Sequence, residues 1–316
     1  LDKDFVGGPF DGAHIDNQVT VAQLNDKLKI GNDHNVRFGV EYRRNVMESA
    51  IMGGDSETAD PDDPSGDELF YNVYSTNAMW NWQINDTLNL TTAARFDHLD
   101  LGRDGPLDAN NPLSDSDFDQ TLNEVSANAG LVWKPTEKDT MRFSFSRGIQ
   151  APSLIDFGMN ARATGGGPGN NGAGLPPDNL VIFGNPRMES PVTTNYEIGY
   201  DRKVKDIGGK LRSAVFYQET WDVKSLLATN LGPQNDTARF RNDNSGDSRT
   251  FGIELSAEGK FKKHFSWDAG YIFQTVDDDL NNGTAGDTTT VPAEFEEATP
   301  EHQINLHLGY EKDEWT

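Results

Sequence analysis

The chain has 316 residues, with 27 Lys and Arg against 51 Asp and Glu, which gives a net charge of −24. No apolar run approaches the roughly 18–20 residues of a membrane-spanning helix, and there is no cysteine, so an α-helical membrane protein, a disulfide scaffold and a cysteine zinc site are all excluded. A nucleic-acid partner is not expected either, because binding to phosphates requires a basic surface.

Apolar and polar residues alternate with a period of two along most of the chain, which is typical of strands with one buried face. In one such segment, Met141, Phe143 and Phe145 share a face, while Arg142 and Ser144 share the other. No amphipathic helix of comparable clarity is found, so the chain is predicted to be all-β. The predicted strands, in chain order, cover about residues 15–31, 35–49, 68–84, 87–102, 122–134, 139–150, 192–204, 210–228, 249–261, 265–276 and 300–311.

Short polar turns and long insertions alternate between these strands. A transmembrane β-barrel has this arrangement, with short periplasmic turns and long extracellular loops, whereas a soluble sandwich has no reason for it. Many of the strands have about 12 residues or more, which is longer than usual in globular proteins and enough to cross a bilayer at a tilt. The insertions lie at about residues 50–67, 103–121, 151–190, 229–248 and 277–299.

Aromatic residues lie close to the tight turns, mostly on the apolar face of their strands. Outer-membrane barrels place such rings at the interface between membrane and water. Aromatic residues in the core of a soluble β protein are the alternative, but a core would not confine them to one end of each hairpin. The residues are Trp80, Trp82, Trp133, Tyr200, Trp267 and Tyr310.

Four motifs between residues 140 and 255 are similar to motifs of the TonB-dependent outer-membrane receptors. The run from Thr140 to Leu154 resembles a strand that leads into an extracellular loop through an Ala-Pro-Ser segment. Residues 184–186, followed by residues 195–200, look like the family's entry into the next strand. The family's Pro-Glu pair falls on Ser190-Pro191, so that part of the motif is degraded.

Two further motifs follow in the same order as in that family. Val215-Phe216-Tyr217 and Gly252-Ile253-Glu254-Leu255 are similar to its next two strands. The resemblance implies an antiparallel transmembrane β-barrel of the 22-stranded type, filled by an N-terminal plug and lying in the outer membrane of a Gram-negative bacterium. The chain is then interpreted as an internal part of a receptor, a partial barrel with about eleven strands and no plug.

The resemblance also implies active uptake of a scarce nutrient, such as a ferric siderophore or another metal chelate. The implied partners are outer-membrane lipid, the N-terminal plug of the same chain, the TonB complex acting through that plug, and a small-molecule metal chelate. The chain has no HExxH, GxSxG or phosphate-loop motif, so we expect a transporter without covalent chemistry and without a cofactor.

The candidate site residues fall into two groups. Arg147, Gln150 and Ser153, where the strand leads into the longest insertion, are candidates for contact with an extracellular ligand. Within that insertion, residues 160–182 are rich in Gly, Pro and Asn and are structureless by composition, as a ligand-gating loop or a disordered segment would be. The resemblance implies the former, a long extracellular loop that folds over the barrel mouth. The second group consists of polar residues expected to face the lumen, either as a paired charge network or as contacts for plug and ligand: Arg37, Glu41, Arg95, Arg142, Glu197, Arg212 and Glu254.

Acidic loops are a possible structural Ca²⁺ site. Asp60, Asp62, Asp63 and Asp67 offer hard oxygen ligands within a short Pro/Gly-rich loop, although without the spacing of an EF-hand. Solvated surface charge is the simpler interpretation of the same residues. The pair His302 and His307 is not expected to hold zinc, because alternation puts the two side chains on opposite faces of a strand.

Two other functions remain open at this point. One is a smaller, complete outer-membrane barrel, such as a passive channel or a lipid hydrolase. It would need a twelfth strand from residues 1–13, which alternate poorly. The other is a soluble, secreted all-β protein that binds its target with Ca²⁺, which would not need aromatic residues confined to positions near the turns.

Overall fold

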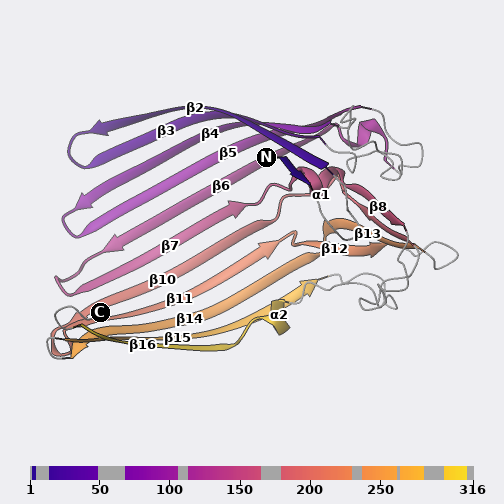
Figure 1. The fold of residues 1–316 in the computed structure, drawn as a ribbon. Coiled ribbons are helices and arrows are strands. Elements are labelled where there is room, and N and C mark those ends of the chain that lie inside the picture. Colours follow the sequence, from indigo (N-terminus) through magenta and orange to yellow (C-terminus); the bar gives the residue numbers. More distant parts are fainter. Residues whose placement is uncertain are drawn as a thin grey trace.

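One long antiparallel sheet makes up most of the protein in a computed structural model (Figure 1). It has twelve strands, and within the described segments no pairing joins its first strand to its last. Helices in those segments are short, and none of them has the length and hydrophobicity to cross a membrane. The structure describes residues 2–4, 14–48, 68–105, 113–164, 179–229, 237–261, 264–280 and 295–311.

Neighbouring strands of this main sheet are also neighbours in the chain, apart from two insertions. Eleven of the strands correspond to the predicted ones, and the remaining one is the three-residue β1. The all-β, antiparallel prediction is therefore confirmed. In sheet order the strands are β1 (Asp2–Asp4), β2 (His14–Ile30), β3 (His34–Glu48), β4 (Glu68–Asn85), β5 (Leu88–Asp104), β6 (Gln120–Trp133), β7 (Asp139–Ile149), β10 (Val192–Val204), β11 (Gly209–Trp221), β14 (Gly246–Phe261), β15 (Phe265–Leu280) and β16 (His302–Tyr310).

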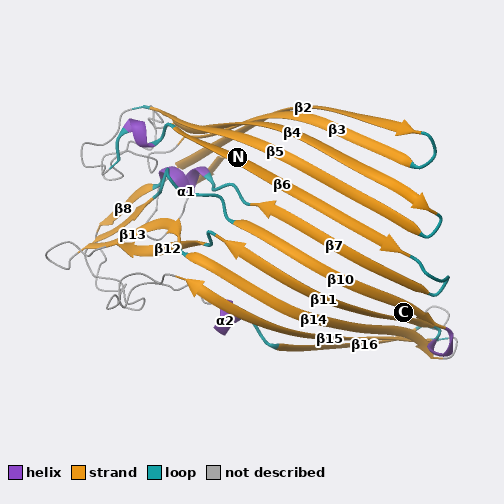
Figure 2. Cartoon of the chain, turned by 180° about the vertical axis from the view of Figure 1, so that it is seen from behind, coloured by secondary structure: helices purple, strands orange, loops and turns teal. Residues whose placement is uncertain are grey.

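The two ends of the main sheet differ in their connections (Figure 2). At the turn end, strands are joined by tight turns, two of which place Gly31 and Gly208 in the left-handed region with φ of 62° and 59°. Glycine adopts this conformation without the steric cost that a side chain would add. At the opposite end, the loop end, the chain enters the long insertions. These include the short helices η1 (Asp115–Asp117) and α2 (Phe295–Ala298).

The main sheet has one apolar and one polar face. Leu131 of β6, Phe143 of β7 and Ile198 of β10 lie opposite one another in the strand register, so they share a face. We call this the outer face, and it carries most of the exposed large hydrophobic side chains of the sheet. The other face, the inner face, carries Arg142 and Asp201, which form an ion pair across β7 and β10.

Aromatic side chains form two rows on the outer face, one near each end of the strands. The row near the turn end was predicted, and in it Trp80 and Trp82 stack with ring centroids 5.2 Å apart. The row near the loop end was not predicted; it contains the Tyr42–Tyr74 pair, 5.3 Å apart, and Tyr196. Two such rows with apolar side chains between them are the outer surface of a membrane-spanning barrel.

Two insertions at the loop end fold together into a second sheet. Here Asp222 lies between the end of β11 at Trp221 and the start of β12 at Lys224, and its backbone is left-handed with φ of 56°. The prediction of one strand over residues 210–228 is therefore wrong, because a left-handed residue interrupts an extended chain. Residues 160–182, expected to be irregular, contribute two strands. The sheet order is β12 (Lys224–Thr229), β13 (Thr237–Asn244), β9 (Asn179–Phe183) and β8 (Asn160–Thr164), and only β13 and β9 pair in parallel.

A hydrophobic cluster lies at the loop end, on the inner face. The short helix α1 (Leu154–Gly158) begins at Ser153, whose hydroxyl oxygen accepts a hydrogen bond from the backbone of Asp156, while the Asp156 carboxylate accepts one from the backbone of Ser153. This capping orients two buried helix residues, spaced three apart, toward the sheet. The cluster consists of Met47, Leu69, Leu99, Leu101, Phe118, Leu154, Phe157 and Met188.

The turn at residues 184–191 packs directly on α1. The backbone nitrogen of Gly184 donates to the carbonyl of Met159 at 2.5 Å, and that of Asn185 donates to the carbonyl of Asp156 at 2.7 Å. A Cβ on Gly184 would lie 2.5 Å from the carbonyl group of Phe157, so only glycine allows this approach. Residues 151–159 and 184–190 of this insertion are thereby folded onto the inner face of the sheet.

Candidate functional site

The inner face of the main sheet is the candidate site. Every residue predicted to face the lumen lies on this face, as the strand register shows. For example, Arg37 of β3 is paired with Met79 of β4, and Glu41 with Ser75, all on the side opposite the aromatic rows. The seven residues do not form one cluster, and the structure divides them into two groups with Arg37 apart from both.

The first group is centred on Arg95. Its guanidinium donates to Asp97 at 2.9 Å, to the hydroxyl of Ser75 at 2.8 Å and to Glu41 at 3.2 Å. Ser75 in turn donates to Asp97. The group thus joins β3, β4 and β5 across the inner face.

Glu41 has further partners at the edge of this group. It accepts a hydrogen bond from Gln23 of β2 and forms an ion pair with Arg43 at 3.3 Å. Its side chain is only 6% exposed, so its charge depends on these partners rather than on water. Four residues of this group were not predicted, although the strand register places them on the same face as Glu41 and Arg95: Gln23, Arg43, Ser75 and Asp97.

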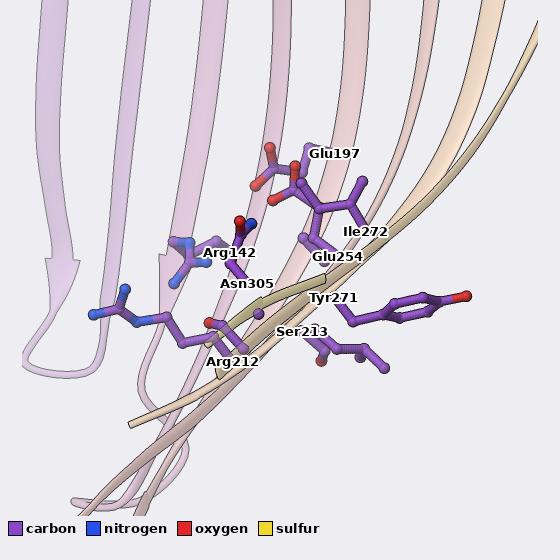
Figure 3. Close-up of a pocket in the computed structure, with 12 residues that line it drawn as sticks. Arg142, Glu197, Arg212, Ser213, Glu254, Tyr271, Ile272 and Asn305 are labelled. Carbon is purple, nitrogen blue, oxygen red and sulfur yellow. The ribbon is translucent and has the colours of Figure 1, made fainter. Parts of the chain in front are cut away.

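The second group lines a pocket of about 320 Å³ on β7, β10, β11, β14, β15 and β16. Arg142, Arg212, Glu197, Glu254 and Asn305 lie on one side of the strands, whereas the ring of Tyr271 extends to the other side (Figure 3). The Arg142 guanidinium lies over Gly199, where a Cβ would come within 2.8 Å of it. The pocket therefore offers cationic, anionic and amide groups to a polar ligand.

Charged pairs continue from this pocket toward the turn end. Lys210 pairs with Glu258 at 3.1 Å, and Arg212 approaches the same carboxylate at 3.8 Å. His307 Nδ1 lies 2.8 Å from a carboxylate oxygen of Asp268. His302 lies on the opposite face, where it contacts the hydroxyl of Tyr271 at 2.9 Å, so the two histidines cannot share one ion.

The three predicted ligand-contact residues are separated by the structure. Arg147 lies on the outer face, in register with Ala127 and Thr194, and does not reach the lumen. Gln150 is exposed just beyond the end of β7, where its backbone nitrogen donates to Pro191. Ser153 caps α1. Any ligand contact by these residues remains a proposal, and for Ser153 it would compete with the helix cap.

The predicted Ca²⁺ ligands cannot be placed. Asp60, Asp62, Asp63 and Asp67 lie outside the described residues. Within the segments that the structure does describe, no group of three or more His, Asp and Glu side chains is arranged to hold a metal ion. Ca²⁺ binding by the acidic loop therefore stays a prediction.

The two loop-end insertions are tied together by polar contacts. Lys224 of β12 donates to Asp156 of α1 at 2.9 Å, and the Asp156 side chain is only 8% exposed. Asn185 donates to Asp243 of β13 at 3.0 Å. The neighbouring Asn244 accepts from the backbone of Glu189 at 2.9 Å. We call these contacts the loop junction; they join α1 and the turn at residues 184–191 to β12 and β13.

One acidic residue next to this junction, Asp222, disfavours the folded state when its carboxylate is charged. Burial raises the pKa of Asp222, and the nearby charges of Glu189 and Asp247 raise it further. The folded state therefore binds the proton of Asp222 more tightly than the unfolded state does. Its contribution to stability is present at low pH and is lost as the pH rises through its folded-state pKa.

We therefore expect Asp222→Asn to stabilise the loop junction at neutral pH. Asparagine tolerates the left-handed backbone and removes the charge. The stability difference between variant and wild type should shrink as the pH falls toward the ordinary range of aspartate, because wild-type Asp222 then becomes neutral. Hydrogen exchange of residues 184–191, corrected for intrinsic rates, measures this difference. A difference that does not change with pH would show that Asp222 does not titrate in this way.

The comparisons with known proteins agree with this architecture. The profile of the family described as "TonB dependent receptor-like, beta-barrel" matches residues 4–316. No curated protein matches the sequence significantly.

Several solved structures share the fold. The siderophore receptor PirA from Pseudomonas aeruginosa is 15% identical with a TM-score of 0.59, over 85% of this chain and 44% of that one. The FrpB iron transporter from Neisseria meningitidis is 13% identical with a TM-score of 0.61, and the match covers 96% of this chain and 41% of that one. The Q482A mutant of the ferric enterobactin receptor PfeA from P. aeruginosa, in complex with enterobactin, is 15% identical with a TM-score of 0.61. The match covers 94% of this chain and 40% of that one. The chain spans about two fifths of the length of these proteins.

Proposed function

The chain belongs to the TonB-dependent receptor β-barrel family, and from this premise we propose that it forms part of the wall of a receptor that actively takes up a scarce nutrient, such as a ferric siderophore or another metal chelate. The proteins of this family lie in the outer membrane of Gram-negative bacteria, and so does this one. The family match over residues 4–316 is the observation that carries the proposal.

The inner face supports this function. Arg142 and Arg212 can donate hydrogen bonds to an anionic chelate in addition to their pairing with Asp201 and Glu258. Glu197 and Glu254 can accept hydrogen bonds from its periphery, and Asn305 can do both. The same groups could also contact a plug that belongs to the same polypeptide, which is the second partner that we propose.

The outer face agrees with this location. Its two aromatic rows would lie at the two membrane interfaces, with the turn end on the periplasmic side and the loop end on the extracellular side. The loop junction and α1 would then narrow the extracellular mouth. TonB, acting through the plug, would supply the energy.

Uptake of radioactively labelled iron chelates by cells with and without the intact receptor tests the proposal. We expect uptake that requires the receptor and stops when TonB is removed. Uptake that continues without TonB would instead indicate a passive channel. If the receptor makes no difference for any ferric chelate, the proposed substrate class is wrong, and copper or other metal chelates follow in the same assay.

A further inference from the structure

Four arginines of the main sheet, among the residues that the structure describes, face outward. Three of them are paired with a carboxylate on the same face. Arg44 lies 2.8 Å from Glu68, Arg202 lies 3.0 Å from Asp139, and Arg249 lies 3.7 Å from Glu219. In each pair, the local charge is neutralised within the protein.

The fourth outward-facing arginine, Arg147, is different. Its register neighbours are Ala127 of β6 and Thr194 of β10, and within the described segments no carboxylate pairs with it. The hydrogen-bond partner of its guanidinium is the backbone carbonyl of Val125. Arg147 is therefore a cation on a membrane-facing surface with no counter-ion from the described part of the chain.

The position of Arg147 explains how such a charge can be tolerated. Phe145, two residues nearer the turn end, packs against Tyr196 with ring centroids 5.3 Å apart in the loop-end aromatic row. The arginine side chain extends past Ala127 to Val125, which is two residues nearer the loop end. A long basic side chain that reaches from the edge of the hydrocarbon region toward the interface keeps its charged group among headgroups.

We infer that Arg147 is a binding site for a phosphate group of an outer-leaflet lipid. The guanidinium supplies two parallel donors that match a phosphate, and the adjacent Phe145 and Tyr196 rings provide an apolar surface for the first carbons of an acyl chain. The occupant is a membrane lipid rather than free phosphate, because the site opens onto the lipid-facing side. This inference depends on the outer-membrane location and not on the transported substrate.

The test uses the intact receptor, purified in detergent and titrated with two lipids. One is bisphosphorylated lipid A, and the other is the same lipid after removal of its phosphates. Native mass spectrometry counts the bound lipid. We expect Arg147→Gln to weaken binding of the phosphorylated lipid about fivefold, which corresponds to the ~1 kcal/mol that one basic residue contributes near an anionic surface. Binding of the dephosphorylated lipid should not change.

Two further variants make the result decisive. Arg147→Lys keeps the charge and should keep most of the preference for the phosphorylated lipid. Arg249→Gln removes an outward-facing arginine that already has Glu219 as a partner, and should have little effect. Equal losses in Arg147→Gln and Arg249→Gln, or a wild-type receptor that binds both lipids equally well, would overturn the assignment.

Discussion

Truncation of Phe157 to alanine should release α1 from the inner face. The Phe157 side chain is 1% exposed and belongs to the hydrophobic cluster at the loop end. Replacing a buried phenylalanine by alanine costs about 3–5 kcal/mol, because apolar contacts are lost and a cavity remains. Since the turn at residues 184–191 packs on α1, we expect both segments to open together. Hydrogen exchange of the intact receptor in detergent measures the free energy of this opening.

Ile155→Ala is the matched control for this prediction. Ile155 lies on the same helix but is only partly buried against the cluster, so its truncation should have a clearly smaller effect. Exchange in the β2–β3 hairpin should remain unchanged in both variants. If the two substitutions lowered protection of residues 184–191 to the same degree, burial of Phe157 in the cluster would not be what holds α1 in place, since alanine raises helix propensity at both positions.

Replacement of Arg95 by methionine should destabilise the sheet by about 2–3 kcal/mol, since among the described residues it leaves Asp97 without a cation and Glu41 with its ion pair to Arg43 alone. The side chains of Glu41 and Asp97 are 6% and 12% exposed, so water replaces the lost guanidinium poorly. Methionine retains the length and apolar stem of arginine, which limits the loss of packing. Urea-induced unfolding of the receptor in lipid vesicles measures the free energy of unfolding.

Two variants separate the charge effect from other causes. In Arg212→Met, the lost partner is Glu258 at 3.8 Å, with both side chains about half exposed, and we expect a change below about 1 kcal/mol. Adding Glu41→Gln to Arg95→Met should restore part of the lost stability, because an amide costs less to bury than a charge. A double variant as unstable as Arg95→Met alone would argue against an uncompensated carboxylate as the cause.

Alternation predicted the main sheet well because each strand has one apolar and one polar side along most of its length. In the segment 210–228 the same pattern was misleading, since alternation continues across Asp222 although the backbone turns there. In residues 160–182, the composition suggested an irregular loop. Strand β8 pairs with β9, and β9 pairs with β13, which is about 60 residues away in the chain. Local composition does not contain this information.

The sequence predicted which face of the sheet carries the candidate site, but not which of its side chains contact one another. Parity alone put the seven polar residues on one face. It could not reveal that Arg95 contacts Glu41, because the two are 54 residues apart and meet only through the register of three strands. Arg147 is the opposite case. Its parity with Phe143 and Phe145 indicated the outer face, but the motif around it suggested a role in ligand contact.

The parallel pairing of β9 with β13 also has a consequence for the order of folding. In the main sheet, each hairpin can be added to the edge left by the previous one, and every step closes only a short or moderate loop. The β9–β13 pair cannot form in this way, since the complete β10–β11 hairpin lies between its two strands. Formation of the β10–β11 hairpin brings β9 and β13 close together, so we expect the second sheet to form after this hairpin and not before it.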